Sequence, residues 1–251
     1  NIPSFVTQNP TFVSQSGHII VTPVTNGCAG TPDTFVITVE PIPVLTAISD
    51  QTVCDNESTL PVTYISTVAN TVFNWSYSSP INIGLITPGS GNIPSFTAFN
   101  GGSTTVVATF TVTPTGPAGG FCVGTPINFS ITVLPRQNPN FSYSPSTICI
   151  TGSQVPPTYA AGANTGGTFS YTGGGYLALN QVTGVIDPAT SNAGSYTVKY
   201  VTPGPCPDSA TYNVTITSAP SATFSYDMMS YCQDAFTIDP DRKSTRLNSS
   251  H

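Results

Sequence analysis

Charged residues are scarce in this chain. They make up 6% of its 251 residues, with five lysines and arginines against eleven aspartates and glutamates. So few basic side chains argue against nucleic-acid binding, in which lysine and arginine neutralise phosphates. The shortage of lysine, glutamate, arginine and methionine also argues against a helical protein, because these residues favour helices. No apolar run approaches the roughly eighteen residues of a membrane-spanning helix, so we expect no membrane insertion in this segment.

The usual signatures of an enzyme are missing as well. The sequence holds no G-x-S-x-G nucleophile elbow, no phosphate-binding loop and no H-E-x-x-H zinc motif. Outside the last eleven residues His18 is the only histidine, so a Ser-His-Asp arrangement would depend on it alone. His18 precedes an apolar run at a predicted strand start, where we expect a structural or surface role. The sequence therefore predicts no catalytic residue and no cofactor.

Six cysteines are present, and they form two series of similar spacing. Cys28, Cys122 and Cys206 are 94 and then 84 residues apart, and Cys54, Cys149 and Cys232 are 95 and then 83 apart. Other segments recur in step: NIPSF at 1–5 returns at 92–96, and ITV at 37–39 returns at 131–133. Such regular spacing indicates a tandem repeat with one cysteine near each end of the unit.

The phase of the repeat predicts the domain boundaries. We expect the second half of a truncated repeat at 1–41, complete repeats at 42–135 and 136–219, and the start of a truncated repeat at 220–240. On this interpretation the chain is cut at both ends. Residues 241–251 hold three of the five basic residues and look like a translated sequencing adapter; a genuine basic tail is the alternative. Without this stretch, two basic and ten acidic side chains give a net charge of −8.

Alternation of apolar and polar residues predicts short strands. The inward-facing residues of the last strand in successive repeats are Phe35, Ile37 and Val39, then Phe129, Ile131 and Val133, then Tyr212, Val214 and Ile216. In an earlier strand Phe73, Trp75 and Tyr77 should point inward, while Asn74 and Ser76 face solvent. Short strands separated by turns rich in proline and glycine are typical of an antiparallel β-sandwich. The predicted fold is all-β, a tandem array of immunoglobulin-like sandwiches.

Several of these segments resemble a known family. Residues 50–54 (DQTVC), 73–75 (FNW), 91–98 (GNIPSFTA) and 129–133 (FSITV) closely resemble the PKD-like repeats of large secreted surface proteins from Bacteroidota-type bacteria. Residues 166–170, 184–188 and 194–198 look like the related immunoglobulin-like repeats of such proteins. The resemblance implies export to the cell surface or medium by the type IX route, in adhesins or gliding-associated proteins. It implies no catalytic residues.

The cysteines agree with an extracellular location. Pairing within repeats predicts the disulfides Cys54–Cys122 and Cys149–Cys206, and leaves Cys28 and Cys232 unpaired because of truncation. Buried free thiols are the alternative. We expect no cysteine-bound metal, because no two cysteines are close in sequence.

The remaining candidate sites carry weaker signals. Asp50, Asp55 and Glu57 flank Cys54 and could bind calcium, but they lack D-x-D-x-D spacing, and turn positions explain them without a metal. Ser209 lies in a D-S-A triplet that resembles the O-glycosylation motif of these bacteria. N-x-S/T triplets begin at Asn56, Asn74, Asn128 and Asn213, and chance explains such triplets in a chain rich in asparagine, serine and threonine.

Two functions follow from these observations. The first is a non-catalytic rod or spacer of a secreted adhesin, whose neighbouring repeats stack and whose ligand, a glycan or another surface protein, the sequence does not identify. The second is a carbohydrate-binding or spacer module of a secreted polysaccharide-degrading enzyme. Sugar binding needs an exposed aromatic platform, for which Tyr171 and Tyr176 are the best candidates. A hairpin with one packed tyrosine is the alternative for that segment.

Overall fold

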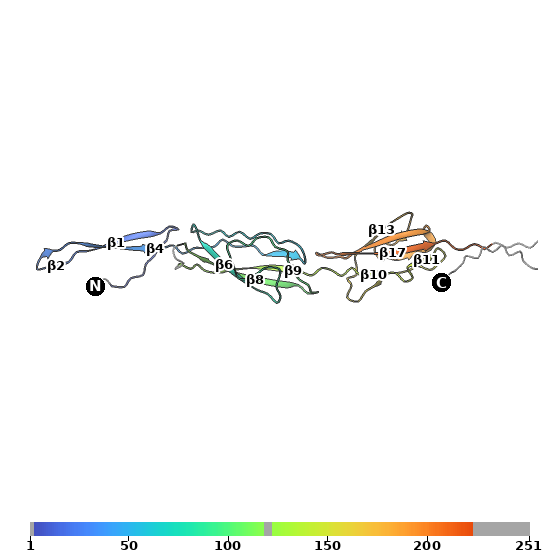
Figure 1. The fold of residues 1–251 in the computed structure, drawn as a ribbon, viewed down its shortest axis with the longest axis horizontal. Coiled ribbons are helices and arrows are strands. Elements are labelled where there is room, and N and C mark those ends of the chain that lie inside the picture. Colours follow the sequence, from blue (N-terminus) through green and yellow to red (C-terminus); the bar gives the residue numbers. More distant parts are fainter. Residues whose placement is uncertain (1–2, 118–121, 223–251) are drawn as a thin grey trace, which may run out of the picture. The chain divides into compact units, whose positions relative to one another are not determined.

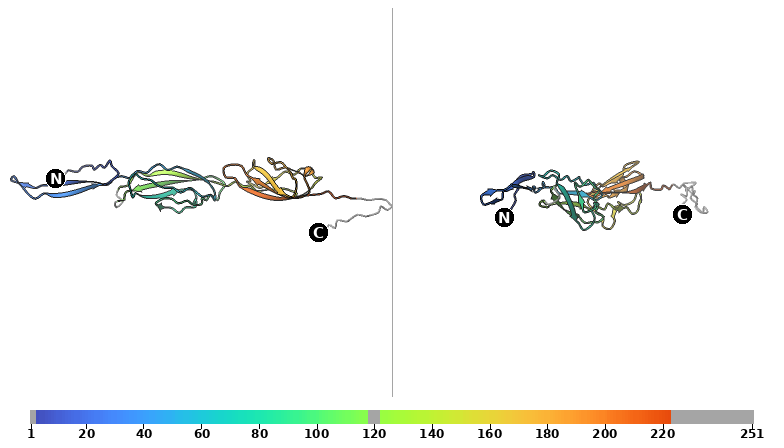
Figure 2. Two further views of the ribbon diagram at one scale, coloured as in Figure 1. Left: turned by 90° about the horizontal axis from the view of Figure 1, so that it is seen from above. Right: turned by 60° about the vertical axis from the view of Figure 1, so that its left-hand side comes forward.

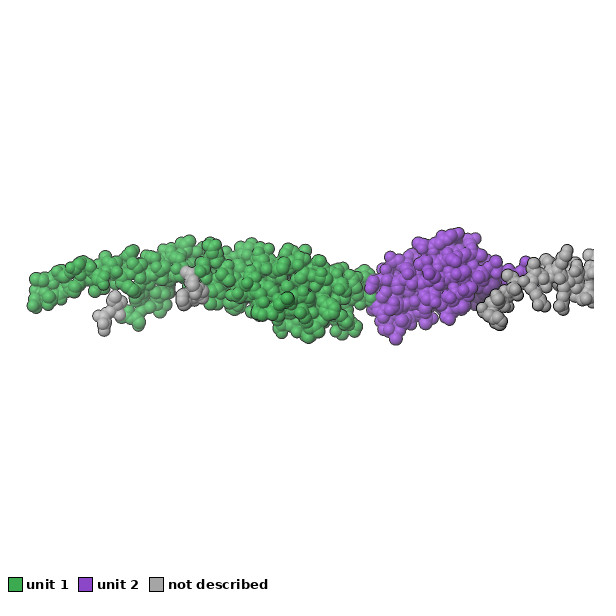
Figure 3. Space-filling view, viewed as in Figure 1, with its two compact units in different colours: residues 1–137, 204–207 green, residues 138–203, 208–251 purple. Residues whose placement is uncertain are grey.

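The computed structural model describes residues 3–117 and 122–222, and the chain folds into two compact units. Unit 1 comprises residues 1–137 and 204–207, and unit 2 comprises residues 138–203 and 208–251 (Figure 3). The short loop at 204–207 thus belongs to unit 1, although the strands on either side of it belong to unit 2.

Unit 1 contains nine strands in its described residues. Figure 1 labels several of them. They are β1 (Gln15–Val21), β2 (Val24–Thr25), β3 (Cys28–Ala29), β4 (Asp33–Val39), β5 (Gln51–Cys54), β6 (Val72–Ser78), β7 (Gly89–Ser90), β8 (Val106–Thr115) and β9 (Ile127–Leu134). β1 pairs with β4, β2 pairs with β3, and the others form a five-stranded sheet in the order β5-β9-β8-β6-β7. Every pairing is antiparallel except that of β5 with β9.

The five-stranded sheet supplies one wall of the core of unit 1. Alternate residues of β8 and β9 are buried, and Phe110 and Ile131 have no exposed surface. Segments outside the sheet cover this face, with Val62 bridged to Ile93. The apolar residues of both layers form a single cluster, which is the arrangement of a β-sandwich.

The strand that carries the single tryptophan has the predicted orientation. Trp75 is 6% exposed, and its indole Nε1 donates a hydrogen bond to the Gly91 carbonyl at 3.0 Å. Phe73 and Tyr77 pack against the same core, whereas the residues between them face solvent. The predicted alternation from residue 73 to residue 77 is therefore confirmed.

Unit 2 contains eight strands in its described residues. They are β10 (Phe141–Ser142), β11 (Thr147–Cys149), β12 (Thr158–Tyr159), β13 (Thr168–Gly173), β14 (Ala178–Leu179), β15 (Ile186–Asp187), β16 (Gly194–Val201) and β17 (Ser209–Thr217). The main sheet has the order β11-β17-β16-β13, and β10 pairs with β12 and β14 with β15. Figure 2 shows this part of the chain in yellow to orange-red from two further directions. A single 3-10 turn, Pro188–Thr190, follows β15.

Tyrosine and phenylalanine dominate the core of unit 2. Tyr143, Phe169 and Tyr200 are at most 2% exposed. The Tyr143 hydroxyl donates to the Gly184 carbonyl at 2.5 Å, and the Tyr200 hydroxyl donates to the Asn164 carbonyl at 2.7 Å. These bonds satisfy polar groups that would otherwise be costly to bury. Burial also raises the pKa of the Tyr143 hydroxyl above its ordinary value.

The predicted all-β sandwich fold is confirmed in both units. One feature of each main sheet differs from the prediction of antiparallel pairing: β5 runs parallel to β9, and β11 runs parallel to β17. The repeat boundaries stay a prediction, and residues 223–251, which include Cys232 and the basic stretch, lie outside the described residues. No helix in the described part of the chain is long and apolar enough to cross a membrane.

Candidate binding surface and disulfide

The two candidate platform tyrosines have different surroundings. Tyr171, in β13, packs edge-on against the Tyr196 ring with 5.9 Å between centroids, and its hydroxyl accepts a hydrogen bond from the Leu177 amide at 3.2 Å. Tyr176, in the segment between β13 and β14, is 59% exposed. Its carbonyl accepts a bond from the Tyr196 hydroxyl at 3.1 Å, which fixes the backbone beneath the ring. Of the two candidate tyrosines, only Tyr176 therefore offers an exposed ring to a ligand.

Tyr176 lies on the wall of a cavity of about 480 Å³ in unit 2. The other lining residues are Gln154, Ala178, Leu179, Asn180, Thr183, Val185, Asp187 and Thr190. Most of them are polar, and none carries a positive charge. This polar composition suits a neutral, hydroxyl-rich ligand better than an anionic one.

Two side chains of the cavity are held in place by local hydrogen bonds. Asn180 Oδ1 accepts from the amides of Val182 and Thr183 at 2.9 and 3.0 Å, which stabilises the turn that ends at Gly184. Asp187 caps the 3-10 turn by accepting from the Ala189 amide, and its other oxygen accepts from Gln154 at 3.2 Å.

The candidate calcium ligands accept hydrogen bonds from backbone amides. Asp50 accepts from the Ser130 amide at 2.6 Å, and Asp55 accepts from the Asn100 amide at 2.6 Å. Glu57 accepts from the Cys54 amide at 3.4 Å. Within residues 3–117 and 122–222 no three His, Cys, Asp or Glu side chains gather as a metal site would require. These acids thus serve as turn and strand acceptors.

The candidate modification sites are exposed. Ser209 begins β17 with its side chain in solvent, and its amide donates to Asp208 Oδ1 at 2.8 Å. The asparagines of the four N-x-S/T triplets are exposed as well. His18 lies in β1, exposed and opposite Val36. Glycosylation at Ser209 stays a prediction.

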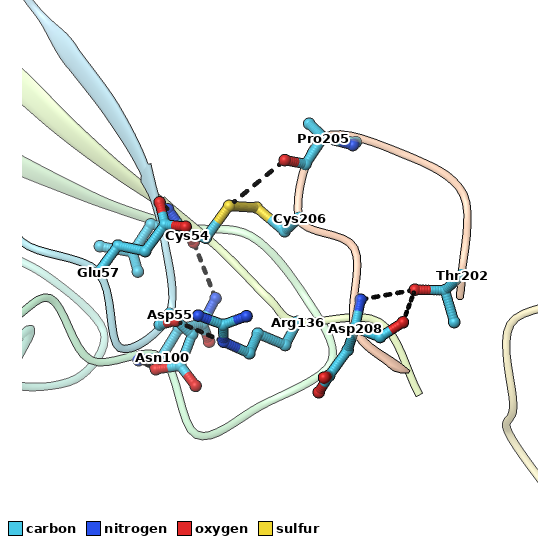
Figure 4. Close-up of a disulfide and its surroundings, with 10 residues drawn as sticks. Cys54, Asp55, Glu57, Asn100, Arg136, Thr202, Pro205, Cys206 and Asp208 are labelled. Carbon is cyan, nitrogen blue, oxygen red and sulfur yellow. Dashed lines mark hydrogen bonds between the residues drawn. A yellow bond between two sulfur atoms is a disulfide. The ribbon is translucent and has the colours of Figure 1, made fainter. Parts of the chain in front are cut away.

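The structure contains one disulfide in its described residues, and it differs from the predicted pairs (Figure 4). Cys54, at the end of β5, is bonded to Cys206, in the loop at 204–207, with 5.6 Å between their Cα atoms. Both residues belong to unit 1. The Gln137 amide donates to the Cys206 carbonyl at 3.3 Å, so a backbone hydrogen bond also holds the loop there. Cys28, Cys122 and Cys149 are free thiols.

Strand register explains why Cys54 does not bond to Cys122. Cys54 faces Leu134 at the last position of β9, whereas Cys122 precedes the first position of β9, next to the bridge between Thr115 and Val123. The eight residues of β9 place its two ends about 23 Å apart. A disulfide needs Cα atoms within about 7 Å of each other. The predicted pair Cys54–Cys122 is therefore wrong.

The same reasoning excludes the pair Cys149–Cys206. Cys149 faces Thr217 at the last position of β17, whereas Cys206 precedes the first position of that strand. The nine residues of β17 separate these ends by about 26 Å. Hydrogen bonding from Thr151 to the Cys149 sulfur, which lies 3.2 Å from Thr151 Oγ1, lowers the pKa of the Cys149 thiol.

No protein-family model and no curated protein sequence matches the chain. Among solved structures, it is similar to mouse clustered PcdhgC3 EC1-3, with 13% identity over 84% of this chain and 78% of that chain and a TM-score of 0.37. The D00-D0 domain of Intimin matches with 13% identity over 70% of this chain and all of that one, with a TM-score of 0.33.

A third similar structure is BT4661, a SusE-like surface located polysaccharide binding protein from Bacteroides thetaiotaomicron. It matches with 13% identity over 72% of this chain and 35% of that chain, with a TM-score of 0.29. At such scores and identities these likenesses give no information about function.

Proposed function

We propose that this chain is a non-catalytic structural and adhesive segment of a large secreted cell-surface protein. In this proposal, tandem PKD-like and immunoglobulin-like repeats act as a disulfide-stabilised rod or spacer that presents a binding domain elsewhere in the protein. The type IX route to the cell surface is part of the proposal, because it follows from the sequence resemblance. The ligand is a glycan or another surface protein.

The Cys54–Cys206 bond is the observation that carries this proposal. It joins residues separated by 152 positions, so a force applied to the two ends of the chain crosses the bond and bypasses the residues between them. Each unit also has its own hydrophobic core. Both features suit a segment that transmits tension without losing its folded parts.

The solvent-facing surface agrees with a spacer role. The outward positions of β8 include Thr109 and Thr111, and those of β17 include Thr211 and Asn213. Hydroxyl and amide groups of this kind hydrate well without attracting oppositely charged partners. Such faces limit nonspecific association.

Single-molecule stretching from the two chain ends tests the proposal. The oxidised chain should stop extending about 500 Å short of the reduced chain, because the bond removes the intervening residues from the force path. The variant with Cys54→Ser and Cys206→Ser is the control, and reductant should not change its extension. An oxidised chain that reaches the reduced length would contradict the proposed mechanical role.

A carbohydrate-binding function is the second candidate, and the exposed Tyr176 ring beside the polar cavity favours it. Tyr176→Ala should weaken binding of a neutral glucan hexasaccharide about tenfold, because stacking on the ring is lost. Titration calorimetry measures the change. Phe99→Ala is the matched control, since Phe99 is an exposed aromatic residue of unit 1, at 49%. Equal binding by all three proteins would count against this function.

A further inference from the structure

The strand pair β1 and β4 has the same register as β8 and β9. Ile19 faces Phe35 in the first pair, and Phe110 faces Phe129 in the second. These positions are related by the offsets of 91 and 94 residues at which the sequence segments recur. The two pairs are therefore equivalent in both sequence and backbone pairing.

The connection after each pair's first strand is equivalent too. The Gly30 amide donates to the Pro23 carbonyl at 2.8 Å, and the Gly124 amide donates to the Pro114 carbonyl at 2.9 Å. The same two offsets relate these residues. The equivalence thus extends beyond the strands into their connection.

The two pairs differ in what covers them. β9 is flanked by β5 and β8 by β6, and residues outside the sheet pack on the face that carries Phe129, which is only 3% exposed. β1 and β4 form a sheet of their own, and Phe35, the counterpart of Phe129, is 60% exposed. Phe5, Ile19, Ile37 and Val39 also line a cavity of about 310 Å³ there. A strand pair built like the core of a sandwich thus has a largely uncovered apolar face, beside which only the segment at residues 5–8 lies among the described residues.

Cys122 is a free thiol. It lies where a layer on β1 and β4, equivalent to the one that contains Cys54, would place its own cysteine. Cys54 faces Leu134 in the covered pair, and the counterpart of Leu134 in the uncovered pair is Glu40. Cys122 Sγ lies 3.8 Å from the Glu40 carbonyl oxygen. Cys122 is in turn the counterpart of Cys206, the residue that bonds to Cys54.

We propose that the apolar face of β1 and β4 binds the first half of a further repeat, and that Cys122 forms a disulfide with the cysteine of that segment. The occupant has the chemistry of residues 42–91, and the inference rests on the proposed repeat organisation. The rule for the whole array is that the first cysteine of each repeat bonds to the second cysteine of the next. Two thiols lose two protons and two electrons in this step, and a disulfide oxidant is reduced to two thiols.

A second copy of this chain fits the surface less well. The cysteine nearest to β1 and β4 in such a copy would be Cys28, which lies beyond the Val21 end of β1. Glu40 and Cys122 lie at the opposite end of the pair, after Val39. A copy that covered the apolar face with its strands in the same direction would therefore bring Cys28 to the end of the pair away from Cys122.

The test adds a copy of residues 42–91 before residue 1 of the full chain. Residue 1 corresponds to residue 92 at the offset of 91, so the added copy completes the repeat. After oxidative refolding, peptide mass spectrometry should find Cys122 linked to the added cysteine and no longer alkylated. Amides of β4 should become protected from hydrogen exchange. The matched control carries serine in place of the added cysteine. In that chain Cys122 should react with the alkylating reagent, while the amides of β4 should still be protected from hydrogen exchange.

Each outcome decides one part of the proposal. Alkylation of Cys122 in the cysteine-bearing chain overturns the disulfide, and unprotected β4 amides in both chains overturn the docking surface. A dimer of the original chain with protected β4 amides also overturns it, because the occupant is then a second copy. The stretching experiment uses the original chain, so its failure is separate from failure here.

Discussion

Trp75 shows how a single side chain constrains its neighbours. Its indole ring lies against Gly89, the residue opposite it in β7. A Cβ atom at residue 89 would overlap the ring carbons of Trp75. Glycine is therefore required here for close approach to the ring, a role that the sequence alone does not reveal.

We predict that Gly89→Ala lowers the free energy of unfolding of unit 1 by about 1–3 kcal/mol, because the added methyl group must displace the ring or the strand. Trp75 is the only tryptophan, so its fluorescence in urea reports the change directly. Gly17→Ala is the control, since nothing lies within 4 Å of its Cβ position. Equal midpoints for the two variants would show that residue 89 tolerates a side chain.

Strands differed in how well the sequence predicted them. The sequence predicted β8 and β9 clearly because one face of each strand is buried and the other faces solvent, which produces strict alternation of apolar and polar residues. Strand direction leaves no such signal, so the parallel pairing of β5 and β11 could not be predicted. Two-residue strands such as β14 and β15 are too short for any period to appear.

The end of β11 allows a prediction about pH. Because the Thr151 hydroxyl bonds to the Cys149 sulfur, it favours the thiolate and lowers the pKa of Cys149. Thr151→Val should raise that pKa, so half-maximal alkylation of Cys149 should occur at higher pH. Mass spectrometry of the individual peptides gives the pH profile. Cys28 is the internal control, and a Cys149 profile that does not move would show that the hydroxyl has no influence.

For the whole molecule, the sequence predicted a disulfide-containing protein but paired the cysteines wrongly. Spacing along the chain shows which cysteines are equivalent, and it does not show at which end of a sheet each one lies. The register of β9 supplies that information. The binding surface was predicted in part, since Tyr176 was a candidate, whereas Gln154 and Asp187 meet only through the antiparallel bridge between Val155 and Ile186.

Loss of the disulfide should destabilise the chain measurably. The entropy of a loop closed over 152 positions corresponds to about 5 kcal/mol of unfolding free energy. The double variant Cys54→Ser and Cys206→Ser should therefore unfold at lower urea concentration, as followed by Trp75 fluorescence. Cys28→Ser is the control because that cysteine is free and exposed. An unchanged midpoint in the double variant would mean that the bond does not restrict the unfolded chain.

The long separation between Cys54 and Cys206 also sets an order of events during biosynthesis. At typical ribosomal speeds of about 5–20 residues per second, roughly 8–30 s pass between synthesis of the two residues. Cys54 must stay reduced, without forming a disulfide to another thiol, throughout that interval. A nascent chain that stalls before residue 206 would thus keep Cys54 as a thiol without its partner.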